Sequence, residues 1–185
     1  QARPGGTRYI FASPGLASHR WRPLSSNVRR RKPPMRNTAP LGCLRLASEY
    51  LQAATSAQTP PTTVVEALRQ RISLPAYFLS GHAMELALKA FLLGRGMTLA
   101  ELKSRKYGHD LAALLTEARR RKLGNEVSLS RPELEAMRLL NEMYSVKELE
   151  YAITGYRRLP SYAITHAVAS KLCTGLQGYV RRIGA

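Results

Sequence analysis

Cysteine is scarce in this 185-residue chain, and long uncharged apolar stretches are missing. The two cysteines, Cys43 and Cys173, are too few for the disulfide framework of a small secreted domain, so we expect reduced thiols and a cytoplasmic protein. The most apolar stretch, residues 72–93, contains Glu85 and Lys89, whereas a membrane-spanning helix needs about 20 mostly apolar residues. We therefore predict no membrane span and no membrane partner.

The signals of β-structure are also missing. No run of four or more residues alternates β-branched or aromatic side chains with polar ones, and the hairpin dipeptide Asn-Gly does not occur. No internal repeat is visible. Apolar residues instead recur with the helical period from residue 41 onward. The sequence thus predicts an all-α protein.

The predicted helices are long and their connections are mostly short, which is typical of an antiparallel bundle of four to five helices. Residues 64–72, with Thr63 and Glu66 as a capping box, either form a short helix or lead into the next helix, because Pro75 can lie in a first turn or produce a kink. The five other helices are expected at about residues 41–58, 75–93, 111–122, 131–146 and 161–183.

Acidic residues are few: 12 stand against 29 lysines and arginines, for a net charge of +17. Residues 1–34 hold eight of the basic residues and no acidic one, which leaves 21 against 12, or +9, for residues 35–185. This excess favours polyanions such as nucleic acids as partners. The basic run Arg119 to Lys122 has a sufficient structural explanation, because cations stabilise the C-terminal end of a helix.

The first forty residues form a basic segment that is rich in proline and arginine. Six of the eleven prolines fall there, and no apolar period is present, so we predict a disordered tail over residues 1–40 before a helical domain over 41–185. Because Met35 stands directly before the helical pattern, we favour residues 1–34 as a leader outside the native protein. A polyanion-binding arm and a targeting segment are the alternatives.

Three stretches together resemble the HEPN domains, the "higher eukaryotes and prokaryotes nucleotide-binding" family. They read LPAYFLSGHAMELALKAFLLGRG, YGHDLAALLTEARRRKL and LNEMYSVKELEY, and they cover residues 74–96, 107–123 and 140–151. The resemblance implies an all-α bundle, often a dimer, in bacterial toxin–antitoxin, defence or stress modules. It implies either a metal-independent ribonuclease or a non-catalytic module, sometimes paired with a nucleotidyltransferase.

The chain departs from the family's ribonuclease motif, in which an arginine precedes a histidine by four to six intervening residues. No histidine here has such an arginine: Lys103 is the nearest equivalent before His109, and Arg105 is one residue too close. We therefore expect a protein that binds RNA or nucleotides, as a homodimer or with a partner protein, without established catalysis. A ribonuclease toxin with a divergent His109 site and a protein-docking module that partners a nucleotidyltransferase are the alternatives.

His109 is the candidate catalytic residue, because histidine suits general acid–base chemistry and a basic loop precedes it. Asp110 beside it is expected to cap the next helix. His82, Glu85 and Lys89 lie three and four residues apart on one helix face, and we interpret this strip as a structural hydrogen-bonding group. The candidate phosphate-binding residues are Lys103, Arg105, Lys106, Arg157 and Arg158.

No cofactor and no metal site are predicted. A His-x-x-Glu spacing occurs at His82 and Glu85, but this spacing is common by chance and no cysteine accompanies it. The glycines Gly94 and Gly96 follow a helix rather than a strand, so they do not form a phosphate-binding loop.

Overall fold

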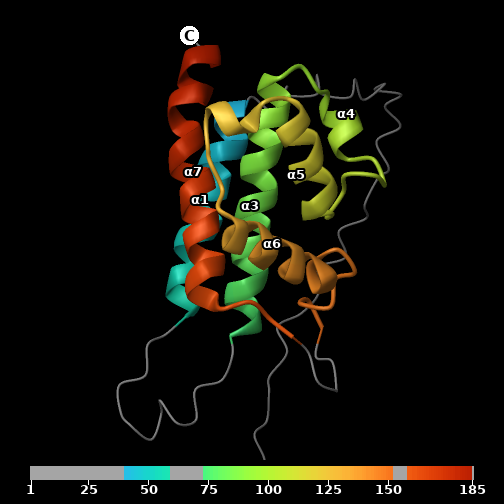
Figure 1. The fold of residues 1–185 in the computed structure, drawn as a ribbon, viewed down its shortest axis with the longest axis vertical. Helices are drawn as coiled ribbons and strands as arrows, with labels where there is room; N and C mark the ends of the chain where they lie inside the picture. The colour runs from blue at the N-terminus through green and yellow to red at the C-terminus, as the bar shows by residue number, and fades with distance from the viewer. Residues whose placement is uncertain (1–39, 59–72, 152–157, 185) are drawn as a thin grey trace, which may run out of the picture. The chain divides into compact units, whose positions relative to one another are not determined.

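The computed structural model describes residues 40–58, 73–151 and 158–184, and this part of the chain is helical without a strand (Figure 1). The all-α bundle that the sequence predicts is thereby confirmed. The helices are α1 (Pro40–Ala57), α3 (Leu74–Gly94), α4 (Leu99–Leu102), α5 (Leu111–Arg120), the 3-10 turn η1 (Leu123–Asn125), α6 (Arg131–Tyr144) and α7 (Tyr162–Gly184).

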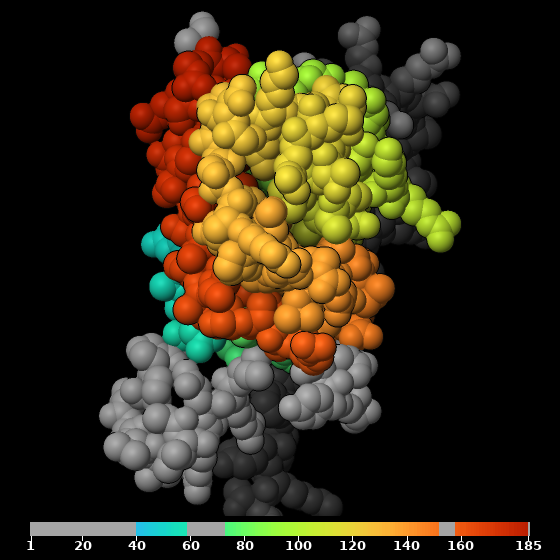
Figure 2. Space-filling view, in the orientation of Figure 1, coloured from blue at the N-terminus to red at the C-terminus, as the bar shows by residue number. Residues whose placement is uncertain are grey.

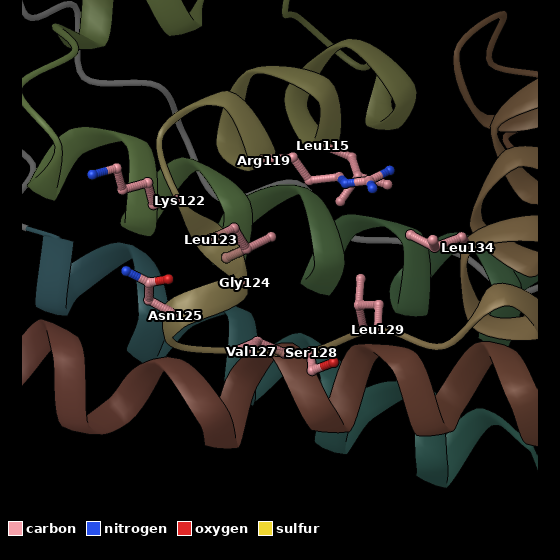
Figure 3. A pocket seen from close by; sticks show the side chains of 10 residues that line it. All are labelled: Leu115, Arg119, Lys122, Leu123, Gly124, Asn125, Val127, Ser128, Leu129 and Leu134. Atoms are coloured by element: carbon pink, nitrogen blue, oxygen red, sulfur yellow. The ribbon is translucent and has the colours of Figure 1, made fainter.

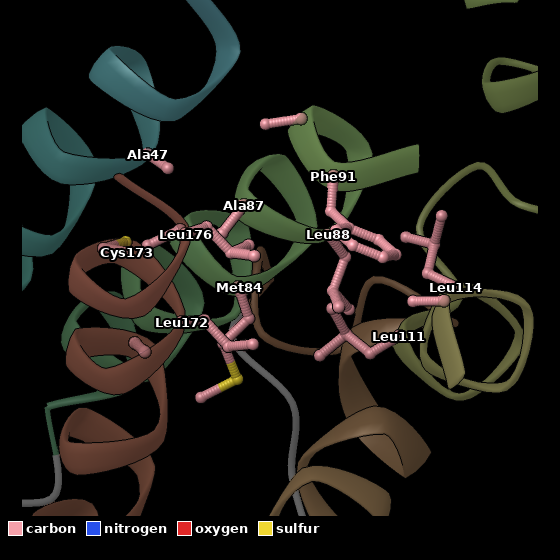
Figure 4. Packing of buried hydrophobic residues seen from close by; sticks show 14 of the residues in the cluster. Ala47, Met84, Ala87, Leu88, Phe91, Leu111, Leu114, Leu172, Cys173 and Leu176 are labelled. Carbon is pink, nitrogen blue, oxygen red and sulfur yellow. The ribbon is translucent and has the colours of Figure 1, made fainter. Parts of the chain in front are cut away.

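Helix α3 is the centre of the bundle and packs against α1, α5, α6 and α7. Its apolar side chains point in several directions around its axis, so more than one face of the helix packs against a neighbour. Met84, Leu88 and Phe91 are fully buried and pack among residues of α5 and α7 (Figure 4). Burial of each such side chain contributes about 1.5–3 kcal/mol.

The helices do not all run in the same direction. Figure 1 shows α1 antiparallel to both α3 and α7, while α6 lies across these helices. The segment between η1 and α6 crosses the face shown in Figure 2, between α5 and α7. The C-terminal end of α6 thus reaches the start of α5 and the middle of α3, where His82, Glu85 and Lys89 lie.

Local sequence signals explain where the helices begin. The Ser73 side chain caps α3 and accepts a hydrogen bond from the Ala76 amide, with Pro75 in the first turn. Ser130 and Glu133 form a capping box at the start of α6. At the end of α3 the chain turns through Gly96, whose φ of +85° is a conformation that glycine adopts without strain.

One helix was missed by the sequence analysis. The four-residue helix α4 has its own capping box, in which the Glu101 carboxylate accepts from the Thr98 amide at 2.6 Å. A helix of a single turn is too short to show a 3.6-residue period, so only the Thr98–Glu101 spacing could have indicated it. This helix leads into the basic turn of residues 103–108.

Several predictions concern residues outside the described part of the chain. These are residues 1–39 of the predicted tail, the alternative helix at 64–72 and the candidate phosphate ligand Arg157. Pro40, the last residue of the predicted tail, instead begins α1, since proline is tolerated in a first turn. Within the described ranges, no helix combines the length and the apolar character that crossing a bilayer requires. Cys43 and Cys173 are both buried free thiols.

Candidate functional site

A buried carboxylate on α3 is the centre of the candidate site. Glu85 lies in the middle of the central helix, and although it is charged it is only 2% exposed. Its Oε1 atom is 2.6 Å from the Lys89 ammonium, and its Oε2 atom accepts a hydrogen bond from the Tyr144 hydroxyl at 2.6 Å. The His109 Nδ1 atom lies 3.0 Å from the same Oε2. We call Glu85, Lys89, His109, Tyr144 and the neighbouring His82 the Glu85 cluster.

Three different parts of the fold supply these side chains. Glu85 and Lys89 are one helical turn apart on α3, His109 immediately precedes the N-cap of α5, and Tyr144 is the last residue of α6. Tyr144 reaches the cluster by packing closely against Gly81, where an added Cβ would be 2.8 Å from its ring. Glycine at position 81 is therefore required for this close approach of α6 to α3.

Hydrogen bonds to α3 and α6 hold the turn before α5 in place. Lys89 also donates to the backbone carbonyl of Gly108 at 2.8 Å, which connects α3 to this turn. Asp110 caps α5 by accepting from the Ala113 amide and also accepts from the side-chain amide of Asn141. The position of His109 is thus determined by contacts with α3 and α6 rather than by its own loop alone.

His82 lies at the edge of the cluster and contacts it mainly through Tyr144. Its Nδ1 atom is 3.1 Å from the Tyr144 hydroxyl but 3.6 Å from Glu85 Oε2, so its hydrogen bond is to the tyrosine. The ring stacks on Phe78 and meets Tyr50 edge-on. The His82 ring is thus in contact with aromatic side chains on two sides.

The electrostatics of the cluster favour an ionised Glu85. Burial by itself raises the pKa of this carboxyl, but contacts with His82, Lys89 and Tyr144 outweigh burial and lower the pKa to about 2. Burial and the adjacent Glu85 charge both raise the pKa of the Tyr144 hydroxyl. Tyr144 therefore stays protonated and donates its hydrogen to the carboxylate.

The protonation of Glu85 determines how His109 is oriented. An ionised carboxylate only accepts hydrogen bonds, so Nδ1 of His109 must carry the proton that lies between them. The Nε2 atom has no hydrogen-bond partner among the described residues, and the side chain is 40% exposed. Such an imidazole can accept a proton at Nε2, or donate one when it is charged, while the carboxylate stabilises the charged form.

The candidate phosphate-binding residues fall into two groups. Lys103, Arg105 and Lys106 are exposed in the turn that leads to His109, and none of them forms an ion pair within the described ranges. The Lys106 ammonium lies 5.0 Å from the centre of the Tyr107 ring. Arg158 instead borders a hollow formed by α6 and the start of α7, and no member of the Glu85 cluster lines that hollow.

His82, Glu85 and His109 have the geometry of a potential metal site, because one ligand atom from each lies within 4.8 Å of the others. However, both oxygens of Glu85 already have close hydrogen-bond donors, and one donor is the positively charged Lys89 at 2.6 Å. A divalent cation would be repelled by this ammonium at short range. The chemistry of the donors thus favours a hydrogen-bonded group over a metal centre.

Sequence reasoning separated residues that the fold brings together. It assigned a structural role to the strip on α3 and a chemical role to His109, whereas Glu85 and Lys89 contact both His109 and its turn. Tyr144 was not among the candidate site residues. Its neighbours in sequence carry no indication of a carboxylate partner 59 positions away.

Comparison of the chain with protein-family models, with curated proteins and with solved structures finds no match.

Proposed function

We propose that the protein binds the phosphate groups of RNA or nucleotides at the surface around His109, as a HEPN-like helical protein. One observation carries this proposal: His109 is held at Nδ1 by the buried Glu85, its side chain is partly exposed, and it follows a turn with three cations that form no ion pair within the described ranges. A histidine anchored in this way is a fixed hydrogen-bond donor or acceptor for a ligand in solution.

The charges of the basic turn need an explanation that the fold alone does not supply. Lys103, Arg105 and Lys106 add three positive charges without a carboxylate partner in the described part of the chain. Exposed lysines and arginines that neutralise phosphates release counterions, and this release is the main source of non-specific affinity for nucleic acids. The excess positive charge of residues 35–185 supports the same class of ligand.

A binding experiment tests this proposal. Binding of the full chain to a fluorescein-labelled 20-nucleotide RNA is measured by anisotropy at several salt concentrations. The triple change Lys103→Ala, Arg105→Ala and Lys106→Ala should reduce the slope of log K against log salt by about 2, because each single-strand phosphate contact contributes about 0.7. An unchanged slope contradicts the proposal.

A matched control removes three charges elsewhere. Arg119, Arg131 and Arg181 are exposed on α5, α6 and α7, and like the cations of the turn they form no ion pair within the described ranges. None of them contacts a member of the Glu85 cluster in the described structure. Their replacement by alanine changes the net charge by the same amount. If this control weakens RNA binding as much as the first triple change, the binding is a property of the net charge and not of the turn.

A second candidate function is cleavage of RNA without a metal, and the Glu85–His109 hydrogen bond of 3.0 Å favours it. In such a reaction His109 Nε2 accepts the proton of a ribose 2′-hydroxyl, and the 2′-oxygen bonds to the adjacent phosphorus. The bond from phosphorus to the 5′-oxygen breaks, and the leaving oxygen takes a proton from water. The products are a 2′,3′-cyclic phosphate and a 5′-hydroxyl.

The integrity of total RNA during expression distinguishes the two functions. An active nuclease slows growth and cuts RNA, and His109→Gln should abolish the cutting, whereas His82→Gln should retain it. Intact RNA in cells that express the unchanged chain contradicts the second function only. If salt-sensitive RNA binding is absent as well, both proposals fail, and docking to a partner such as a nucleotidyltransferase is the hypothesis left.

A further inference from the structure

The basic run at the end of α5 consists of two kinds of cation. Arg120 and Arg121 each contact the Glu117 carboxylate at 2.6 Å, and Arg121 also donates to the carbonyl of Arg95 at 2.7 Å. Arg119 and Lys122 form no ion pair within the described ranges. Arg119 and Arg120 both lie in the last turn of α5, where cations stabilise the helix end, but only Arg120 is also paired with a carboxylate, so the Arg119 charge remains available to a ligand.

Arg119 and Lys122 border a cavity of about 340 Å³ between α5, the segment at 122–129 and the start of α6 (Figure 3). The buried side chains of Leu123 and Val127 contribute to its lining. No acidic residue lines the cavity, and no member of the Glu85 cluster does so either. The half-buried apolar residues of its lining are Leu115, Leu129 and Leu134.

Contacts with α7 hold the cavity lining in place. Val127 packs so closely on α7 that a Cβ added to Gly175 would lie 2.7 Å from its Cγ2 atom. The neighbouring Glu126 carboxylate accepts from Arg182 of α7 at 2.7 Å, and the Val127 amide donates to the Leu123 carbonyl at 2.9 Å. Because these residues are already held in place, a ligand that enters the cavity does not have to order them, and this lowers the entropic cost of binding.

We propose that this cavity binds a small molecule with an apolar body and one carboxylate, of the class of medium-chain fatty acids. The leucine side chains suit an apolar body, and the Arg119 guanidinium can form two parallel hydrogen bonds with a carboxylate. Lys122 also lines the cavity, but Figure 3 shows its side chain directed away from Arg119, so Arg119 is the partner for the carboxylate. The volume is at the lower end of the range for ligand cavities, about 300–1,000 Å³, which excludes long-chain fatty acids.

Titration of the full chain with octanoate, followed calorimetrically, tests the proposal. The expected result is saturable binding of one octanoate per chain, with 1-octanol binding more weakly because it lacks the charge. Arg119→Gln should weaken octanoate binding about tenfold, since the charge-assisted pair is lost. Arg120→Gln is the matched control, because this neighbour is paired with Glu117 and does not line the cavity, and it should change the affinity less than twofold.

A second measurement locates the ligand. Methyl NMR should show shifts of Leu123, Leu129 and Leu134 on addition of octanoate, while His109→Ala should leave the affinity unchanged. Equal binding of octanoate and 1-octanol, equal affinity of the Arg119→Gln and Arg120→Gln variants, or shifts confined to other methyl groups would each overturn the proposal. Loss of RNA binding in the 103–106 variant has no bearing on it, so the two proposals fail separately.

Discussion

Charged side chains have partners in the Glu85 cluster, whereas at the cavity that Arg119 and Lys122 border they form no ion pair within the described ranges. In the cluster, a buried carboxylate has donors at both oxygens, and the ammonium of Lys89 lies 2.6 Å away. At the cavity, Arg119 and Lys122 border apolar side chains and have no carboxylate partner in the described part of the chain. The difference indicates that charges in the cluster are balanced within the fold, whereas those at the cavity are available to a ligand.

The largest expected effect comes from removing the central charge. Glu85→Ala leaves Lys89 with its side chain 12% exposed and without its carboxylate, so we expect a loss of about 3–5 kcal/mol in the free energy of unfolding. Urea unfolding followed by circular dichroism measures it. Glu135→Ala is the control, since that carboxylate is exposed on α6. Equal effects of the two changes would show that the cluster is not a balanced internal group.

The pH dependence of stability should reflect the same carboxylate. The pKa of Glu85 is lowered from 4.5 to about 2, so the folded state binds this proton less readily than the unfolded state does. The stabilisation is present above pH 4.5 and is lost as the pH falls through about 2, with a total of about 3 kcal/mol. Subtracting the profile of Glu85→Gln from that of the unchanged chain isolates this contribution. A difference that does not vary between pH 5 and 2 contradicts the assignment.

Replacing Tyr144 with phenylalanine should have an intermediate effect. The hydroxyl donates to a charged oxygen at 2.6 Å, so Tyr144→Phe should destabilise the fold by about 1.5–3 kcal/mol. Tyr162→Phe is a suitable comparison, because its hydroxyl donates to the neutral carbonyl of Ala54 at 3.0 Å. Charged partners make hydrogen bonds about twice as strong, so the Tyr162 change should cost about half as much. Equal losses in the free energy of unfolding for Tyr144→Phe and Tyr162→Phe would contradict a stronger hydrogen bond to the charged Glu85.

The smallest expected effect is at the cavity. Arg119 is exposed and has no ion-pair partner in the described ranges, so Arg119→Gln should change the free energy of unfolding by less than about 0.5 kcal/mol. Its urea midpoint, compared with that of the unchanged chain without ligand, measures this. A larger destabilisation would mean that Arg119 stabilises the folded state, and its charge could then no longer be contrasted with the balanced charges of the Glu85 cluster.

Much of the local structure could be predicted from neighbouring residues. The bounds of α3 follow from an apolar stretch with Pro75 at one end and glycine at the other. The start of α6 follows from Ser130 and Glu133, since a capping box involves residues three positions apart. The helix α4 was missed because one turn cannot display a period.

The cluster could be predicted only in part. The spacing of Glu85 and Lys89 indicates a pair on one helix face, and this pair exists. The contacts of Glu85 with His109 and Tyr144 join residues 24 and 59 positions away, and no periodicity connects them. Because the sequence gives no sign that His109 and Tyr144 contact Glu85, the strip on α3 and His109 were interpreted as two separate features.

The sequence by itself determined the all-α class, the positions of the long helices and the unusual presence of a glutamate within the most apolar of them. These properties depend on side-chain periodicity and on caps, which act over a few residues. Only the tertiary structure decided that Glu85 orients His109 and that Arg119 borders a cavity while Arg120 is paired. Such relations arise when α6 packs against Gly81 and the segment at 122–129 packs against α7, because packing brings distant residues into contact.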